Sequence, residues 1–582
     1  MTPKYTDEKQ AQIVIALLKS HGIRRVIASP GATNINFVGS IQSDPFFTIY
    51  SAVDERSAAY MACGLAAETG EPVVISCTGA TASRNYLPGL TEAYYRKLPI
   101  LAVTSTQIRA RIGQHNAQAI DRSTPPRDTL KLSLELPVVK DADDVWECEI
   151  KVNRAILELS RNGGGPAHLN LPTTYSRNFD LLQLPDYRVI KRWNADDVDG
   201  GKLPALSGRV GVFVGSHPTW TIEETAALDR FCEANNGAVF CDHSSGYHGK
   251  YRVLSALIGA QDSADKAHLR PDVMIHIGEV SGDYEIAPLM GPHVWRVNRD
   301  GEIRDSWRRL RHVFEMSELR FLHHYSQGPQ GSTTYFETLR EVLEEHRAKV
   351  PDLPFSNLWL ASQFARHIPA GSVVHFAILN SLRAWNFFDL PEGVRTASNV
   401  GGFGIDGCTS SLIGASLADP ERLYFLVTGD LAFFYDMNSL GNRHLAPNVR
   451  ILLVNNGKGT EFTQYGHAGS TFAGDANQFI AADGHFSSKS PDLGMYFAKG
   501  LGLDYVRVSS KQESDVIASR FFSSEPLERP MMIEVMVDPD EESDALRIIR
   551  NMHQDNKTKV RNAAKRVIGQ KGIRVAKQLL GR

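Results

Sequence analysis

The hydrophobic pattern of the first part of the chain alternates between helices and short apolar strands. Residues 6–22 carry apolar side chains at helical spacing, and we expect Thr6 to cap this helix and Gly22 to end it. Three short apolar runs follow, each leading through Gly, Pro, Ser or Thr into a helical pattern; they cover residues 25–29, 72–76 and 99–104. Apolar strands that alternate with helices are typical of parallel sheets covered on both faces.

Two further sets of strands repeat this pattern after polar stretches near residues 185–205 and 326–333. The second set comprises the runs 209–214, 238–241, 273–278 and 293–297, and the third comprises 372–376, 423–428, 450–454 and 531–537. The pattern therefore predicts an α/β protein with three doubly wound parallel-sheet domains. We expect these domains at residues 1–185, 200–345 and 355–540, followed by a separate tail at 545–582.

Composition narrows the class of protein. The chain has 63 Lys and Arg against 66 Asp and Glu, so its net charge of −3 does not suit a chain that is mainly a polyanion binder. Its apolar runs are shorter than the roughly 18 residues of a membrane span, and its polar start does not resemble a signal peptide. The six cysteines form no C-x-x-C pair, which favours buried thiols in a reducing compartment. We expect a cytoplasmic protein.

The near-neutral total conceals a basic end. Residues 545–582 contain eleven Lys and Arg but a single acid, Asp555, with apolar residues near helical spacing. This predicts a basic amphipathic helical tail, interrupted around Gly569 and Gly572. One interpretation is a solvated helix packed on its own dimer; the other is contact with an acidic partner or with the inner face of an anionic membrane. The tail lacks Phe, Trp and Tyr for base stacking, so we do not expect nucleic-acid binding.

Two polar residues follow buried strands of the third set. Asp430 comes directly after the run 423–428 and Gly429, and Asn456 follows the run 450–454, 26 residues further on. Ligands of open α/β sheets bind beyond the carboxyl ends of strands, where a carboxylate and an amide oxygen suit Mg²⁺ bridging a diphosphate. Taken singly, each would be read as an ordinary turn or loop; the pair at this spacing favours a binding site.

Glu55 begins a predicted helix whose other residues are almost all small or apolar, so the helix must be buried on most sides. A glutamate at a helix start also has a structural interpretation, as a favourable partner of the helix dipole. The loop Thr78-Gly79 after the next strand is polar and allows close approach of the backbone, which favours a functional role for this region.

These residues belong to motifs that resemble the thiamine-diphosphate-dependent decarboxylases and carboligases over about residues 5 to 540. The closest likeness is to the branch of 2-succinyl-5-enolpyruvyl-6-hydroxy-3-cyclohexene-1-carboxylate synthase in menaquinone synthesis. The matching stretches are residues 29–31, 54–56, 116–120, 380–382, 404–407, 429–431, 435–438 and 455–457. The resemblance implies a pyrimidine-binding domain, a central Rossmann-like domain and a diphosphate- and magnesium-binding domain, in that order.

The resemblance also implies roles for single residues. Glu55 would activate the cofactor, Gln118 would lie near the reacting carbonyl, and His115 would relay protons, although a loop histidine is more often structural. Cofactor contacts are implied for Thr78, Gly79, Asn380, Ser381, Gly404, Ile405, Gly429, Asp430, Leu431 and Asn456. The metal ligands would be Asp430, Asn456 and the Lys458 carbonyl. Family members place Glu55 and the metal motif on different subunits, which implies a homodimer or homotetramer.

This chain departs from the synthase branch at substrate-binding arginines. Thr33 stands where the branch has the arginine of Ser-Pro-Gly-Ser-Arg-Ser, and Val400 stands where it has Asn-Arg-Gly. Another arginine aligns with Trp385, although Arg383 is nearby. Because arginines hold carboxylates through bidentate contacts, their loss predicts a less cationic, more apolar pocket and a reaction other than that of menaquinone synthesis.

The expected function is that of a carboligase, a lyase or transferase that decarboxylates a pyruvate-like 2-oxo acid and transfers the acyl carbanion to an acceptor carbonyl. A keto-sugar nucleotide of cell-envelope glycan synthesis is one acceptor that suits the altered pocket and the basic tail. The alternatives are a simple 2-oxo acid decarboxylase, an acetolactate-synthase-like enzyme and a catalytically silent, membrane-tethered scaffold. The expected cofactors are thiamine diphosphate and Mg²⁺; FAD is not predicted, because the central domain lacks a G-x-G-x-x-G fingerprint.

Overall fold

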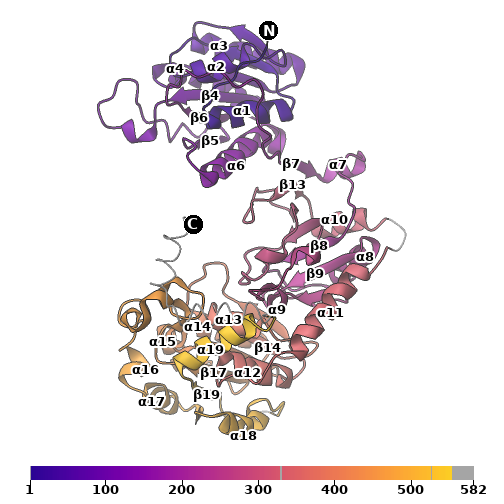
Figure 1. Cartoon of the computed structure of the whole chain (residues 1–582), viewed down its shortest axis with the longest axis vertical. Coiled ribbons are helices and arrows are strands. Elements are labelled where there is room, and N and C mark those ends of the chain that lie inside the picture. Colours follow the sequence, from indigo (N-terminus) through magenta and orange to yellow (C-terminus); the bar gives the residue numbers. More distant parts are fainter. Residues whose placement is uncertain (1, 328–330, 526, 554–582) are drawn as a thin grey trace, which may run out of the picture. The chain divides into compact units, whose positions relative to one another are not determined.

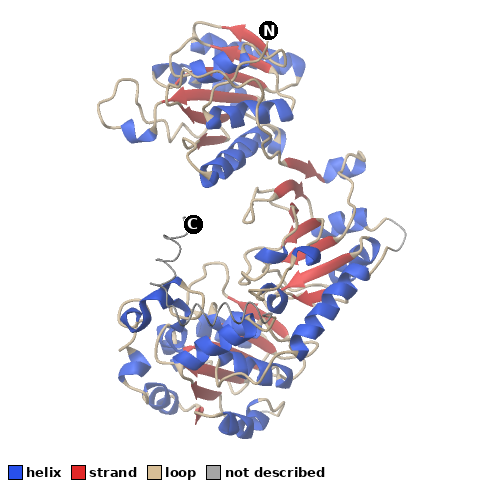
Figure 2. Cartoon of the chain, in the orientation of Figure 1, coloured by secondary structure: helices blue, strands red, loops and turns tan. Residues whose placement is uncertain are grey.

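The computed structural model describes residues 2–327, 331–525 and 527–553. These residues form two compact units (Figure 1): Met1–Asn194 with Asp300–Glu315, and Ala195–Arg299 with Met316–Arg582. Figure 2 shows helices packed on strands throughout both units. The α/β class and the three parallel sheets predicted from the sequence are confirmed.

The first sheet lies in the first unit and has the strand order β2-β1-β3-β4-β6-β5, with every pair parallel. Its strands are β1 (Arg25–Ala28), β2 (Thr48–Ser51), β3 (Val73–Thr78), β4 (Ile100–Thr106), β5 (Leu132–Glu135) and β6 (Ala167–Pro172). Its helices are α1 (Lys9–Ser20), α2 (Ile35–Ile41), α3 (Glu55–Thr69), α4 (Thr81–Asn85), α5 (Leu87–Tyr95) and α6 (Ala142–Glu158). The three apolar runs of the sequence are β1, β3 and β4.

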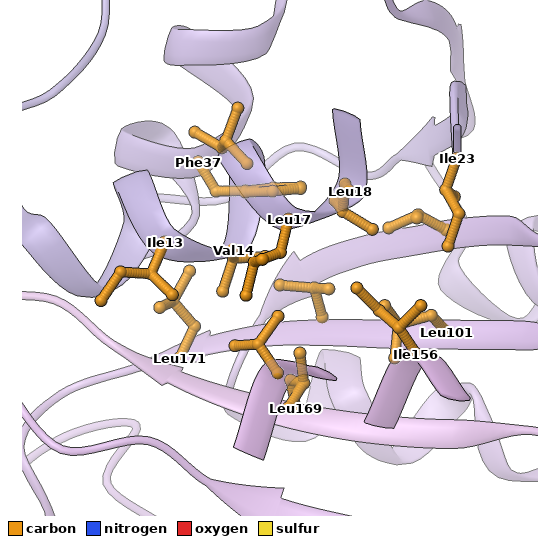
Figure 3. Packing of buried hydrophobic residues seen from close by; sticks show 14 of the residues in the cluster. Ile13, Val14, Leu17, Leu18, Ile23, Phe37, Leu101, Ile156, Leu169 and Leu171 are labelled. Atoms are coloured by element: carbon orange, nitrogen blue, oxygen red, sulfur yellow. The ribbon is translucent and has the colours of Figure 1, made fainter. Parts of the chain in front are cut away.

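Helix α1 covers one face of this sheet with its apolar side (Figure 3). Val14 and Leu17 of α1 belong to one buried cluster with Leu101 of β4 and Leu169 of β6. The predicted helix is confirmed, but Thr6 does not cap it. The helix begins at Lys9, and the Thr6 hydroxyl instead accepts a hydrogen bond from the Glu8 backbone N–H at 3.3 Å, in a turn before the helix.

The second sheet lies in the second unit and runs β10-β9-β8-β11-β12, again all parallel. Its strands are β8 (Val210–Val214), β9 (Gly237–Cys241), β10 (Arg252–Leu254), β11 (Val273–Ile277) and β12 (His293–Asn298). The helices of this part are α7 (Ala195–Asp199), α8 (Ile222–Ala234), α9 (Ala256–Gly259), α10 (Glu318–Tyr325) and α11 (Thr334–Ala348). The parallel pair β7 (Lys191–Asn194) and β13 (Leu310–Glu315) is counted with the first unit.

The third sheet repeats the topology of the first. Its order is β15-β14-β16-β17-β19-β18, which places each strand where its counterpart lies in the first sheet. The strands are β14 (Val373–Phe376), β15 (Arg395–Ser398), β16 (Tyr424–Gly429), β17 (Val449–Asn455), β18 (Asp504–Val508) and β19 (Met531–Met536). The helices are α12 (Asn357–Phe364), α13 (Asn380–Trp385), α14 (Cys408–Ser416), α15 (Asp430–Tyr435), α16 (Phe486–Lys489), α17 (Leu493–Gly500), α18 (Lys511–Phe521) and α19 (Pro539–Arg550).

The predictions about the cysteines, membrane spans and the basic tail can be compared with the structure to different extents. All six cysteines are buried free thiols, as expected. Within the described residues, none of the helices has the length and the apolar character needed to cross a membrane. The predicted basic tail begins within α19, but its residues from 554 onward lie outside the described residues.

Candidate cofactor site

Asp430 and Asn456 meet at the carboxyl edge of the third sheet. Strands β16 and β17 pair with Gly429 opposite Val454, so both chains leave the sheet side by side; Asp430 opens α15 and Asn456 follows β17. Both line a cavity of about 100 Å³ in the second unit. Other lining residues are Asn380, Ser381, Ile405, Gly429, Leu431 and Lys458. The structure thus gathers the predicted cofactor and metal residues of this half, and Gly404 precedes Ile405 in the same loop.

Asp430 is buried, with 4 % of the residue exposed. Its Oδ1 accepts a hydrogen bond from the Leu431 backbone N–H at 2.9 Å, and the Ser487 hydroxyl lies 3.5 Å from Oδ2. Burial raises the pKa of Asp430 to about 7, because no cationic side chain among the described residues is paired with it to stabilise the charged form. A buried carboxylate among amide and carbonyl oxygens is a hard donor set that fits Mg²⁺.

The Thr460 hydroxyl ties the two sides of this cavity together, and the sequence reasoning missed it. It accepts a hydrogen bond from Asn456 Nδ2 at 3.0 Å and lies 3.1 Å from the side-chain amide of Asn380. Asn456 Oδ1 accepts from the Lys458 N–H at 3.2 Å, and the Lys458 carbonyl accepts from the Thr460 N–H at 3.0 Å. The position of Thr460, just after Asn-Asn-Gly-Lys-Gly, could have indicated it, since a Gly-rich loop at this edge approaches ligands closely.

We expect Thr460→Val to weaken binding of the cofactor and metal by roughly 5- to 100-fold, because two hydrogen bonds that orient Asn380 and Asn456 are lost. Titration calorimetry of thiamine diphosphate with Mg²⁺ measures the effect. Thr463→Val is the matched control, since the Thr463 hydroxyl bonds only within its own turn, to the Thr460 carbonyl at 3.4 Å. Equal affinity of the Thr460 variant and the wild type would refute this role.

Glu55 begins α3 in the first unit. Asp54 caps the helix by accepting a hydrogen bond from the Ser57 N–H at 3.0 Å, so the helix start is fixed. The small residues of α3 allow α5 to approach closely: a Cβ at Gly89 would lie 2.5 Å from the Ala59 Cβ. Glu55 is half-buried, and its Oε2 accepts a hydrogen bond from Asn85 Nδ2 at 3.3 Å.

Thr33, Thr78 and Gly79 form a close-packed polar corner at the carboxyl edge of the first sheet. The Thr33 hydroxyl donates to the Ser105 carbonyl at 2.7 Å and contacts the hydroxyl of Thr78. A Cβ at Gly79 would lie 2.6 Å from that same carbonyl and 2.7 Å from Arg122 Nη2, so only glycine fits there. Thr33 is 3 % exposed, and the position that carries an arginine in the resembling branch here holds a small, buried hydroxyl.

Gln118 and His115 lie on the exposed loop between β4 and β5, both with positive φ. The structure places them in the first unit with Glu55, Thr78 and Gly79, whereas the predicted metal ligands belong to the second unit. The structure therefore gathers the predicted residues of the second unit in one cavity, whereas Gln118 and His115 share the first unit with Glu55, which is hydrogen-bonded to Asn85 rather than to either of them.

The arginines near the predicted diphosphate and metal residues of the second unit are paired with carboxylates. Arg383 forms an ion pair with Glu461, and its guanidinium stacks on the Tyr284 ring at 4.7 Å. Both line a larger cavity of about 580 Å³, together with Arg550, which pairs with Glu285 at 2.5 Å. Trp385 is buried and donates from Nε1 to Asn357. The guanidinium groups of Arg383 and Arg550, which line this cavity, are thus both paired with carboxylates.

Comparison with known proteins identifies the class. Residues 8–124 match the model described as "Thiamine pyrophosphate enzyme, N-terminal TPP binding domain". The chain is a thiamine-diphosphate-dependent enzyme, as its motifs indicated.

Similar proteins extend this likeness over nearly the whole chain. The 2-succinyl-5-enolpyruvyl-6-hydroxy-3-cyclohexene-1-carboxylate synthase of Bacteroides fragilis is 29% identical over 559 residues, covering 93% of this chain and 98% of the relative. The synthase of Bacteroides thetaiotaomicron is 28% identical over 95% of this chain and 100% of the relative. That of Desulfotalea psychrophila is 26% identical over 89% and 96%. The predicted likeness to this synthase branch is confirmed.

Proposed function

We propose that this enzyme is a Mg²⁺-dependent carboligase that decarboxylates a 2-oxo acid and transfers the resulting acyl group to an acceptor carbonyl. The observation that carries the proposal is the buried carboxyl group of Asp430, which forms no ion pair with any described residue, in a cavity shared with Asn456, Lys458 and Asn380. The similarity to named synthases favours a catalyst over the silent scaffold.

The residues of the second unit would hold the diphosphate end of the cofactor. Asp430, Asn456 and the Lys458 carbonyl bind Mg²⁺, Asn380 and Ser381 lie near the diphosphate, and Ile405 supports the cofactor ring. Bound there, thiamine diphosphate supplies the carbanion chemistry that amino-acid side chains cannot. In this proposal residues 355–540 form the diphosphate domain, 1–185 the pyrimidine domain and 200–345 the central domain.

The residues of the first unit would handle protons and position the substrate. Glu55 hydrogen-bonds the pyrimidine ring of the cofactor, and Gln118 holds the reacting carbonyl through its amide. His115 is the candidate for proton relay. Thr78 and Gly79 keep the backbone close to the cofactor. Because each unit carries only one half of the site, we propose a homodimer or homotetramer with sites completed between subunits.

The substrates differ from those that the relatives' name describes. Thr33 and Trp385 replace arginines of the branch, and Arg383 is paired with Glu461. The lack of free arginines at these positions favours a pyruvate-like donor over a dicarboxylate. A keto-sugar nucleotide remains the specific acceptor candidate. A simple decarboxylase and an acetolactate-synthase-like enzyme are the alternatives. Cytoplasmic location and membrane contact through the tail stay predictions.

Incubation of the purified enzyme with thiamine diphosphate, Mg²⁺ and a panel of 2-oxo acids tests the proposal. We expect CO₂ release that requires both cofactors and rises at least about tenfold when the correct acceptor carbonyl is present, since the acceptor opens the productive route for the acyl group. Rapid CO₂ release with free aldehyde and no acceptor dependence would indicate the simple decarboxylase. Acetolactate formation from pyruvate alone would indicate the synthase-like alternative.

A further inference from the structure

Arg122 brings a guanidinium group to the carboxyl edge of the first sheet. Its Nη1 donates to Thr104 Oγ1 at 2.6 Å, and its Nη2 donates to Asn170 Oδ1. Thr104 of β4 and Asn170 of β6 are register partners, so the guanidinium bridges two adjacent strands where they end. Gly79 makes room for it, because a Cβ there would lie 2.7 Å from Arg122 Nη2.

No carboxylate in the described part of the chain is bonded directly to this guanidinium. Among the described residues it forms no ion pair, and its buried Nε has no hydrogen-bond acceptor. The charge of Glu135 on β5 acts on it at longer range. Burial lowers the pKa of Arg122 to about 10, so the group remains charged at neutral pH. Its neighbour His168 adds no second charge: burial lowers the pKa of His168 to about 3, and the neutral ring bonds Thr104 and Ser133 at 2.6 and 2.8 Å.

Arg122 is half-buried, and a partly desolvated cation without a bonded carboxylate is stabilised when an anion joins it. Arg122 lines a cavity of about 110 Å³ within the first unit, where an anion could do so. The apolar part of the cavity wall comes from Tyr86, Leu87, Leu90, Pro125, Pro126 and Leu130. Arg84 and Asp121 also line this cavity. Apolar walls with a few charged groups at the edge are typical of a site for a small molecule with an anionic group.

The cavity also adjoins the residues proposed to face cofactor and substrate. The Ser105 carbonyl accepts the Thr33 hydroxyl and would lie 2.6 Å from a Cβ at Gly79, the residue that Arg122 contacts. One polar corner therefore holds Thr33, where the branch has its arginine, and the guanidinium of Arg122, which enters from the loop after Gln118.

We infer that Arg122 binds an anionic group of the substrate, a carboxylate or phosphate, located away from the reacting carbon. Arg122 would thus supply the positive charge that an arginine at position 33 supplies in the resembling branch. The carboxylate lost as CO₂ is not its ligand, because pairing with a cation would stabilise that carboxylate in the ground state and oppose decarboxylation. The inference rests on the proposed function, and either the donor acid or the acceptor can carry the anionic group.

Arg122→Gln tests the inference, because glutamine can still bond Thr104 or Asn170 but carries no charge. Arg111→Gln is the matched control: it removes the same charge from the same loop, and Arg111 is exposed and bonded to Gln107 at 2.6 Å. We expect Arg122→Gln to raise the KM of the anionic substrate about 10- to 100-fold with a smaller change in kcat, while Arg111→Gln leaves both unchanged.

The two sources of the anion give different results. If the donor carries it, a dicarboxylate donor replaces the pyruvate-like donor of the proposed function: the wild type then prefers 2-oxoglutarate to 2-oxobutyrate in CO₂ release, and Arg122→Gln loses this preference. If the acceptor carries it, donor KM values stay unchanged and the KM of a phosphorylated or carboxylated acceptor rises. Unchanged KM values for donors and acceptors alike would overturn the inference.

A binding measurement separates this inference from the proposed function. Inorganic phosphate or oxalate should raise the thermal midpoint of the cofactor-free wild type and of Arg111→Gln, but not that of Arg122→Gln. This result would stand even if no 2-oxo acid were turned over. An equal rise in all three proteins, or a lower midpoint of Arg122→Gln without any anion effect, would show a structural role instead.

Discussion

Replacing Glu55 by Gln should lower turnover by about 10²- to 10⁴-fold, the range that positioned proton-transferring groups contribute. The substitution keeps the size of the side chain and its hydrogen bond with Asn85, but it removes the carboxylate that would share a proton with the cofactor's pyrimidine ring. Helix α3 should form as before, because its start depends on the Asp54 cap rather than on Glu55. We therefore expect the affinity for thiamine diphosphate and Mg²⁺ to change little.

Steady-state CO₂ release and titration calorimetry, measured on the same preparations, separate catalysis from binding. Glu68→Gln is the control, since Glu68 lies on α3 but is exposed. Undiminished turnover of the Glu55 variant would rule out its assignment. Loss of cofactor affinity in parallel with turnover would show that Glu55 mainly binds the cofactor.

The strands could be predicted because buried parallel strands are almost wholly apolar. The runs at 72–76, 423–428 and 450–454 appear as β3, β16 and β17, each within a few residues. The start of α1 could not be placed, because Thr6 can bond the backbone either as a helix cap or in a preceding turn. The common strand order of the first and third sheets explains why both put functional candidates at the ends of equivalent strands, Thr78 as the last residue of β3 and Asp430 directly after β16.

The candidate site was predictable where topology alone decides it. Parallel strands end at one edge, so Asp430 and Asn456 had to lie near each other once both strands were recognised. Contacts between distant segments could not be foreseen. Thr460 reaches Asn380, 80 residues away, and Arg383 is paired with Glu461 instead of standing free for a substrate.

Asp430→Asn should abolish Mg²⁺-dependent cofactor binding while the protein remains folded. Asparagine retains an oxygen that accepts from the Leu431 N–H, and it removes a charge that burial makes unfavourable. It also removes the one carboxylate of the proposed metal site. The affinity should fall by more than the about 10- to 100-fold that loss of a mere supporting residue costs.

Calorimetric titration of thiamine diphosphate with and without Mg²⁺, together with the thermal midpoint of the cofactor-free protein, measures both effects. Asp419→Asn is the control: Asp419 lies before β16, at the opposite edge of the same sheet, and pairs with Arg422 at 3.3 Å. We expect this control to bind like the wild type. If Asp430→Asn still bound the cofactor with full Mg²⁺ dependence, the metal would have to be held elsewhere, and the carboxyl edge of the third sheet would lose its proposed role.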